Sequence, residues 1–132
     1  MRSVNAATAI DPAEAVLNQS LLGQYRQRKT GLLERLIAAY LEEAPQFFQK
    51  IRGAAESSNF DVMKLNAHAL KSCSNNLGAT RLAKICQAIE DAASARNGDD
   101  VTFLMEKIGL ESFEAEQALK GELYALKRPA LQ

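Results

Sequence analysis

His68 is the only histidine in this chain of 132 residues, and it lies three residues before Lys71 in a run of small and helix-favouring residues. On an α-helix this spacing places an imidazole and an ammonium group one turn apart. Imidazole is largely neutral and nucleophilic near physiological pH, whereas a lysine keeps its positive charge. Such a pair suits a phosphoryl group that must arrive and leave again.

The residues around His68 predict which side of the helix it occupies. At about 100° per residue, Leu70 lies roughly 200° from His68, so the two cannot share a face. The side of Leu70 also carries Met63, Cys73 and Leu77, with Asn66 as a polar exception. The opposite side is expected to be wholly polar, with Asp61, Lys64, His68, Lys71, Ser72 and Asn75. We therefore expect His68 to be exposed at mid-helix, with lysines nearby that provide charge for an anion.

Composition excludes several classes of function. Sixteen basic residues balance sixteen acidic ones, so the chain lacks the positive field that gathers nucleic acid or an anionic membrane. Cys73 and Cys86 form no C-x-x-C pair and no cluster with the histidine, which argues against a zinc site and predicts free thiols. No stretch approaches the ~20 apolar residues of a membrane span. We expect a cytoplasmic monomer without a metal site, nucleic-acid binding or direct membrane contact.

The elements that position His68 are predicted to be helices. Glycine and proline are scarce, and apolar residues recur at intervals of three and four along almost every long segment. Asp11 and Pro12 are typical of a helix start and predict a short helix to about Gln24. The next segment carries an apolar stripe from Leu33 to Ile51, and because the stripe keeps its phase across Pro45, we expect a kink there rather than a break.

Three further helices are predicted after a connection at 57–59. The first runs from Phe60 or Asp61 to Gly78, the second is capped by Thr80 and ends near 96–98, and the third starts at Asp99 or Asp100. The expected fold class is all-α, an antiparallel four-helix bundle with an additional short N-terminal helix. The bundle is expected at 11–124, between a tail or linker at 1–10 and a C-terminal tail at 125–132.

A longer pattern surrounds His68. Residues 67–79 read AHALKSCSNNLGA, and residues 82–90, on the next predicted helix, read LAKICQAIE. This segment resembles the histidine-containing phosphotransfer (HPt) domain, whose pattern is roughly A-H-x-L-K-G-x-x-x-x-L-G-x-x-x-L-x-x-x-C-x-x-[IL]-E. A lone H-x-x-K would be weak evidence, whereas this match keeps its spacing over two helices. With the predicted helices, the resemblance covers about residues 11–124.

The resemblance implies a role for His68 as the phosphoacceptor, which exchanges a phosphoryl group with the aspartate of a response-regulator receiver domain. Lys71 would stabilise phosphate charge, and the receiver would hold the Mg²⁺ ion, so this chain would bind no cofactor. Lys64, Ser72 and Asn75 are candidate partner contacts. Glu90, on the neighbouring helix, is a candidate supporting contact to the His68 region, with an ordinary surface carboxylate as the equal alternative.

Ser72 departs from the family pattern, which usually has glycine immediately after the lysine. Serine keeps the position small, adds a hydroxyl group and costs less helix stability than glycine. We expect phosphotransfer to persist with this serine.

The resemblance also implies a setting. The chain carries no ATP-binding or autokinase motif, so we expect a phosphoryl carrier rather than an enzyme. Its partners would be a receiver domain and a hybrid sensor kinase, with the chain free-standing or the C-terminal, cytoplasmic part of a membrane-bound kinase. The alternative is a degenerate helical module that binds a receiver or kinase without accepting phosphate, and Lys71 beside His68 argues against it. The phosphoacceptor domain of a chemotaxis-type kinase would require dimerisation and ATP-binding domains.

Overall fold

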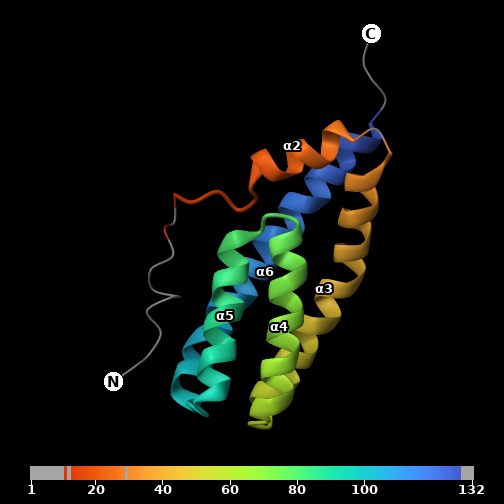
Figure 1. The fold of residues 1–132 in the computed structure, drawn as a ribbon. Helices are drawn as coiled ribbons and strands as arrows, with labels where there is room; N and C mark the ends of the chain where they lie inside the picture. Colours follow the sequence, from red (N-terminus) through yellow and green to blue (C-terminus); the bar gives the residue numbers. More distant parts are fainter. Residues whose placement is uncertain (1–10, 12, 29, 129–132) are drawn as a thin grey trace.

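The computed structural model describes residues 11, 13–28 and 30–128, and every regular element in this part of the chain is a helix. The elements are α2 (Gln19–Gln27), α3 (Leu32–Glu56), α4 (Phe60–Asn76), α5 (Thr80–Ser94) and α6 (Gly98–Lys127). Figure 1 shows α3 to α6 side by side as an antiparallel bundle, with α2 lying across one end. The predicted fold class is therefore confirmed. The tail predicted at 1–10 lies outside the described residues.

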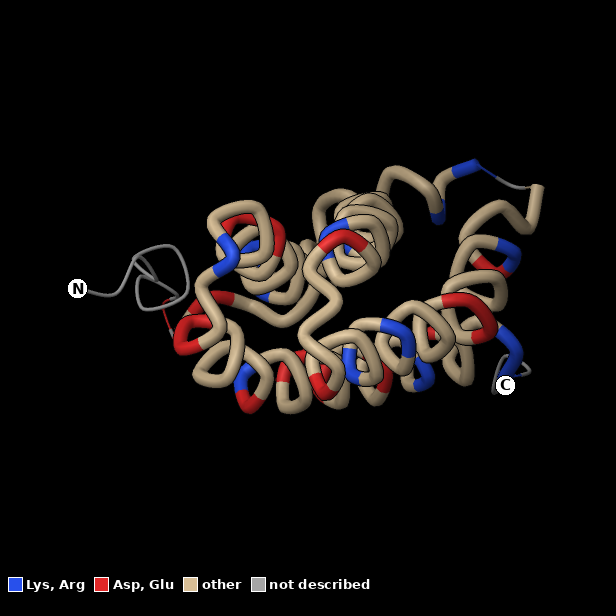
Figure 2. The backbone as a smooth tube through the Cα atoms, turned by 90° about the horizontal axis from the view of Figure 1, so that it is seen from below, with Lys and Arg blue, Asp and Glu red and all other residues tan. Residues whose placement is uncertain are grey.

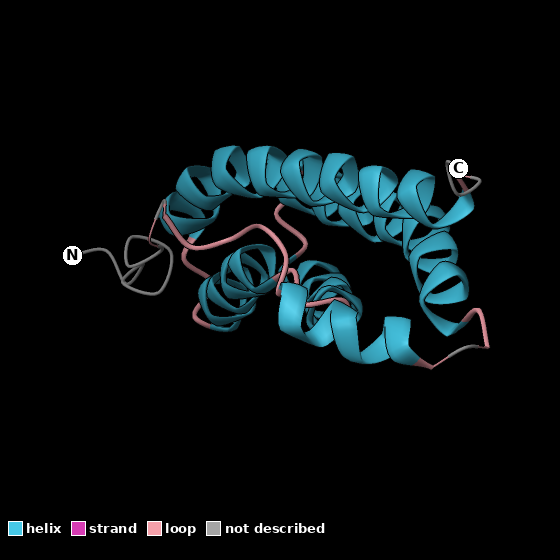
Figure 3. Cartoon of the chain, turned by 90° about the horizontal axis from the view of Figure 1, so that it is seen from above, coloured by secondary structure: helices cyan, strands magenta, loops and turns pink. Residues whose placement is uncertain are grey.

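The four long helices form a closed ring of contacts. Each packs against the next one along the chain, and α6 returns to α3. Seen from above in Figure 3, the described chain is helix and loop only. Among the described residues no helix combines the length and hydropathy needed to cross a bilayer. Figure 2 shows basic and acidic residues interspersed along the helices rather than confined to one face, in keeping with their equal numbers.

One core runs through the bundle, because each long helix supplies an apolar stripe at helical spacing. Its largest fully buried side chains are Leu22, Ile37, Ile51, Met63, Leu70, Leu77, Leu82, Ile85, Ile89, Leu104, Ile108 and Leu119. Burial of each of these stabilises the fold by about 1.5–3 kcal/mol. Asn66, the polar exception predicted for α4, is also buried, and its amide donates a hydrogen bond to the Val62 carbonyl at 2.9 Å.

The two cysteines are free and contribute to this core. Burial raises the pKa of the Cys73 thiol to about 11 and raises the pKa of the Cys86 thiol as well. Both groups therefore remain protonated thiols at neutral pH, which makes them poor nucleophiles. Their state as free thiols agrees with the prediction from spacing.

Most helix boundaries lie within two residues of their predicted positions. Helix α3 is undivided at Pro45, as the unbroken phase of its stripe indicated. Thr80 is the first residue of α5 rather than its cap, a position that Ala79 occupies, and its hydroxyl donates a hydrogen bond to Glu14. Helix α6 continues to Lys127, beyond the expected bundle end at 124, because Leu126 packs against the core.

The N-terminal helix begins later than predicted. Around Asp11 the chain makes a turn, in which the carboxylate accepts a hydrogen bond from the Ala13 N–H at 2.9 Å. Helix α2 instead starts at Gln19, where the side chain of Asn18 caps it by accepting from the Leu21 N–H at 3.1 Å. Aspartate and asparagine are equally good caps. The predicted start at residues 11–12 was therefore wrong, because Asp11 and Asn18 can each cap a helix and Asn18 is the one that caps α2.

Residues 13–18 form a strap, so named here because they tie the start of the described chain to α5. The carboxylate of Glu14 accepts from the Lys84 ammonium at 2.9 Å and from the Thr80 hydroxyl at 2.8 Å. These two hydrogen bonds, that of Lys84 first, lower the pKa of Glu14 below its ordinary value. The strap is thereby fixed against the helix that faces α4 across the candidate site.

The strap also closes over the link between α4 and α5. Gly78, in this link, has a positive φ of 71°, and its carbonyl accepts a hydrogen bond from the Asn18 N–H at 2.8 Å. A Cβ atom at Gly78 would lie 2.7 Å from the Cβ of Asn18 and 3.0 Å from its backbone nitrogen. Only glycine combines this left-handed conformation with such a close approach.

Candidate functional site

His68 projects from the middle of α4 toward solvent, and its side chain is 61% exposed. Its neighbours Ala67 and Leu70 are buried in the core, so the helix that carries the ring is anchored beneath it. The Nδ1 atom of the ring lies 3.2 Å from Oε2 of Glu90. Among the described residues, Nε2 has no hydrogen-bond partner. The ring is thus held by one nitrogen and open at the other.

Glu90 joins the imidazole to the lysine. It comes from α5 and is only 9% exposed, with Oε2 facing His68 and Oε1 lying 2.7 Å from the Lys71 ammonium. A buried carboxylate is costly unless it is paired. The ion pair with Lys71 supplies that compensation, so Glu90 is not an ordinary surface carboxylate.

Lys71 is more enclosed than its place on the expected polar face suggested. Its side chain is 20% exposed and crosses to α5, where the ammonium donates to Oε1 of Gln87 at 2.7 Å as well as pairing with Glu90. Gln87 is itself oriented, because its amide donates to the Asp91 carboxylate at 2.9 Å. The ammonium is thus held between α4 and α5 by one hydrogen bond and one ion pair.

Gln87 was not selected from the sequence, although a signal was present. It lies three residues before Glu90 on α5, just as His68 lies three residues before Lys71 on α4. Residues three apart on a helix share a face. The site is therefore built from two such pairs, one on each helix.

Leu65 contradicts the expectation that the His68 side of α4 is wholly polar. It lies about 60° round the helix from His68, and it is 70% exposed. The candidate partner contacts Lys64, Ser72 and Asn75 are exposed on the same side. The surface around the imidazole thus combines polar groups with one large apolar side chain.

The hydrogen bond to Glu90 selects the tautomer of His68. An ionised carboxylate only accepts hydrogen bonds, so the neutral ring must carry its proton on Nδ1. The lone pair is then on Nε2, the nitrogen that faces outward. This arrangement presents a positioned nitrogen nucleophile beside a cation that is already paired.

We expect Glu90→Ala to slow phosphoryl uptake at His68 about tenfold or more, because the ring loses the partner that fixes its tautomer and orientation. The uptake rate should be measured together with the ¹⁵N chemical shifts of the imidazole, which report the protonated nitrogen. Wild type should show protonated Nδ1, and the variant a mixture of tautomers.

Glu42→Ala is the matched control for Glu90→Ala, because this carboxylate is exposed on α3 and takes no part in the contacts that hold His68 and Lys71. It should change the uptake rate less than about threefold. Unaltered uptake and tautomer in Glu90→Ala would show that Glu90 does not position His68.

The fold is a four-helix bundle that presents His68 on the exposed side of α4, with Lys71 and Glu90 beside it. The chain belongs to the Hpt domain family, whose model matches residues 35–128. Hpt domains are phosphocarriers of two-component phosphorelays rather than ATP-dependent enzymes, and they act with response regulators and kinases. The predicted family is thereby confirmed.

Two solved structures share the fold. Histidine-containing phosphotransfer protein B (HptB) from Pseudomonas aeruginosa PAO1 is 18% identical, with a TM-score of 0.79 over 86% of this chain and 98% of that chain. The HPT domain from the Hpt sensor hybrid histidine kinase from Shewanella is 24% identical, with a TM-score of 0.74 over 86% and 97% of the two chains. At these identities the likeness concerns the fold. No curated protein matches the sequence.

Proposed function

We propose that His68 is the phosphoacceptor of this Hpt domain and that it exchanges a phosphoryl group with the aspartate of a response-regulator receiver domain. The observation that carries the proposal is the state of the ring. One nitrogen is held by Glu90 at 3.2 Å, and the side chain is 61% exposed with Nε2 directed outward. A nucleophile for a partner protein needs this combination of fixed orientation and open access.

The transfer step follows from this geometry. Nε2 attacks the phosphorus of the aspartyl phosphate in line, the N–P bond forms, and the P–O bond to the aspartate breaks, which returns the carboxylate to the receiver. The Nδ1 proton stays on the ring, and the Glu90 carboxylate stabilises the positive charge that develops there. Reversal of the same steps returns the phosphoryl group to a receiver.

Charge on the transferred group would be shared between the partners. The transition state carries negative charge on three equatorial oxygens. Lys71 places a cation near the site, and a Mg²⁺ ion held by the receiver would supply further neutralisation. This chain would contribute no cofactor of its own.

The surface around His68 would form the docking site for the receiver. Lys64, Ser72 and Asn75 are exposed on the same side of α4 as the imidazole, and Leu65 adds an apolar contact. Ser72 stands where the family usually has glycine, so its hydroxyl would face the docked partner. The chain would work in the cytoplasm as a monomer, free-standing or as the C-terminal domain of a hybrid sensor kinase.

The proposal is tested by incubating the protein with a receiver domain that carries a radiolabelled aspartyl phosphate. The protein should acquire label that is labile in acid and stable in base, the behaviour of a phosphoramidate. Receivers from several relay systems should be tried in parallel. Binding of these receivers without any label on the protein would contradict the proposal and favour a docking module that does not accept phosphate.

A further inference from the structure

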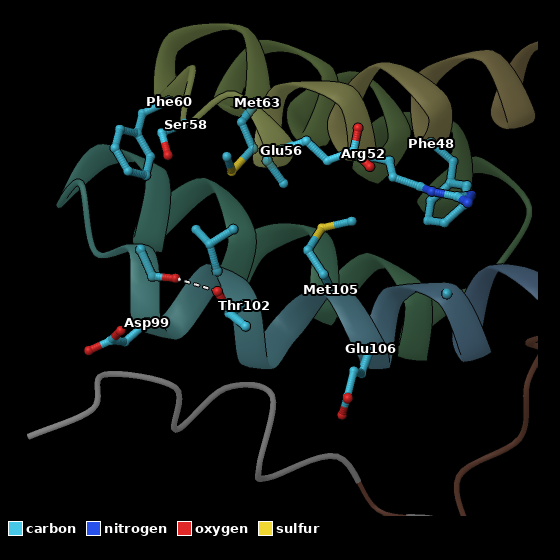
Figure 4. Close-up of a pocket in the computed structure, with 14 residues that line it drawn as sticks. Phe48, Arg52, Glu56, Ser58, Phe60, Met63, Asp99, Thr102, Met105 and Glu106 are labelled. Carbon is cyan, nitrogen blue, oxygen red and sulfur yellow. Dashed lines mark hydrogen bonds between the residues drawn. The ribbon is translucent and has the colours of Figure 1, made fainter.

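A long groove lies between α3 and α6, the pair of helices that does not carry the candidate site. It consists of two cavities of about 720 and 300 Å³, which adjoin because Phe48 and Gly109 line both. Figure 4 shows the larger cavity, with Met105 of α6 extending toward Phe48 and Arg52 of α3, and with Glu106 at its edge pointing away from α3. The groove is therefore a continuous surface feature, separate from His68.

The walls of the groove are apolar. The larger cavity is lined by Phe48, Phe60, Met63 and Met105, and the smaller one by Leu41, Pro45 and Phe113. Phe113 is 59% exposed, and Leu110 on the same helix is exposed too. Large apolar side chains that cluster in the open are typical of a surface that another molecule covers.

Gly109 gives a second indication. It lies inside α6, where glycine costs roughly 1 kcal/mol of helix stability relative to alanine, yet a Cβ there would meet no atom within 4 Å. The interior of this domain therefore does not require glycine at this position. Where the two cavities meet, the missing side chain leaves room for another backbone to approach closely.

The rim of the groove is acidic. Glu56, Asp99 and Glu106 line the larger cavity together with one cation, Arg52, whose guanidinium lies 5.9 Å above the centre of the Phe48 ring. A second guanidinium, that of Arg96, lies 5.7 Å above the ring of Phe60 at one end of the cavity. Within the described part of the chain, none of the three carboxylates has an ion-pair partner. The charges around the apolar floor therefore complement a cationic ligand.

We propose that this groove binds a cationic amphipathic helix from a partner protein. The residues of α6 that line it extend from Gly98 to Glu116, a length of about 27 Å at 1.5 Å per residue, which matches a helix of roughly 18 residues. Such a helix would lay its apolar stripe on the groove and place basic residues over the rim. Met105, which is partly exposed in the groove, adapts readily to different apolar side chains.

This binding would be independent of the phosphotransfer proposed for His68. The groove lies mainly between α3 and α6, and α4 contributes only Phe60 at its start and Met63 and Leu70 from the side of that helix opposite the imidazole. One surface would hold a partner while the other remains open to a receiver. The partner helix would thus keep this carrier close to the proteins that it serves.

The test uses two synthetic fluorescent peptides of about 18 residues. Both carry the same stripe of Leu and Phe at helical spacing, and they differ only in having Lys or Glu as flanking residues. Fluorescence anisotropy with the 132-residue protein should show at least about tenfold tighter binding of the lysine peptide, weakening as salt is added. Equal affinity for both peptides would overturn the proposal.

Matched variants locate the binding. Gly109→Trp fills the junction of the cavities and should weaken lysine-peptide binding more than about tenfold, whereas Gly121→Trp, on the same helix outside the groove, should not. Glu106→Lys should weaken it similarly, and Glu42→Lys, an exposed carboxylate that lines neither cavity, should have little effect. Circular dichroism verifies that each variant is helical.

Two further outcomes decide the identity of the occupant. Unchanged lysine-peptide binding in both Gly109→Trp and Glu106→Lys would overturn the groove as the site. A dimer of the protein that sedimentation detects, and that Gly109→Trp abolishes, would overturn the partner helix in favour of a second copy. Because His68→Gln should leave peptide binding unchanged, the peptide assay and the phosphotransfer assay fail independently.

Discussion

His68→Gln should remove phosphoryl acceptance, with the rate of label uptake falling at least about a thousandfold. Glutamine can replace the hydrogen bond to Glu90, but its amide nitrogen has no free lone pair with which to attack phosphorus. Loss of the attacking group typically removes nearly all of the rate of a covalent step. The result is measured as the label that the variant acquires from a phosphorylated receiver.

The stability of His68→Gln should stay close to that of the wild type. The side chain is 61% exposed, and exposed substitutions of this kind usually change the free energy of unfolding by no more than about 0.5 kcal/mol. Lys50→Gln, an exposed lysine on α3 outside the proposed docking surface, is the control and should retain label uptake within a few-fold. Label of the same acid lability on the His68→Gln variant would place the phosphoacceptor elsewhere.

Gly78→Ala should be the most damaging small substitution in the bundle, lowering the free energy of unfolding by about 2–4 kcal/mol. Two costs combine. A side chain disfavours the positive φ of 71°, and the new Cβ would lie 2.7 Å from the Cβ of Asn18 and 3.0 Å from its backbone nitrogen. Backbone cannot move aside as a flexible side chain can, so the strap must shift.

Urea unfolding measures this loss, and the melting temperature should fall by about 10 °C. Gly109→Ala is the control, because it changes a glycine within α6 that has open space around it and an ordinary helical conformation. That substitution should stabilise the protein by up to about 1 kcal/mol. Equal effects of the two substitutions would show that the approach of Asn18 to Gly78 carries no stability.

Local periodicity was sufficient to predict the helices and the exposed position of His68. The angle between His68 and Leu70 depends only on the geometry of one helix, and the structure agrees with it. The start of α2 could not be predicted in the same way, because both Asp11 and Asn18 are residues that can cap a helix. Burial of Leu17 beside Asn18 and the hydrogen bond from Asn18 to Gly78 favour the later start, and neither contact is local in sequence.

The supporting contacts of the site depend on how two helices are placed against each other. Whether Lys71 points to solvent or to α5 is decided by the rotation and offset of α5, which bring Gln87 and Glu90 opposite it. The residue pattern along α4 alone does not predict the rotation or the offset of α5. The family resemblance drew attention to Glu90 because it records residues that lie together in space, whereas Gln87 and Leu65 were not part of that pattern.

The way in which Lys71 is held bears on the energetics of a relay. A cation that waited unpaired beside His68 would bind the arriving phosphoryl group strongly and make the phosphorylated domain a thermodynamic sink. Here the ammonium already donates a hydrogen bond to Gln87 and forms an ion pair with Glu90, each at 2.7 Å, so any contact with phosphate would have to replace contacts of similar kind. If His68 carries the phosphoryl group as proposed, the equilibrium constant for transfer would stay nearer to unity, and the group would pass onward as readily as it came.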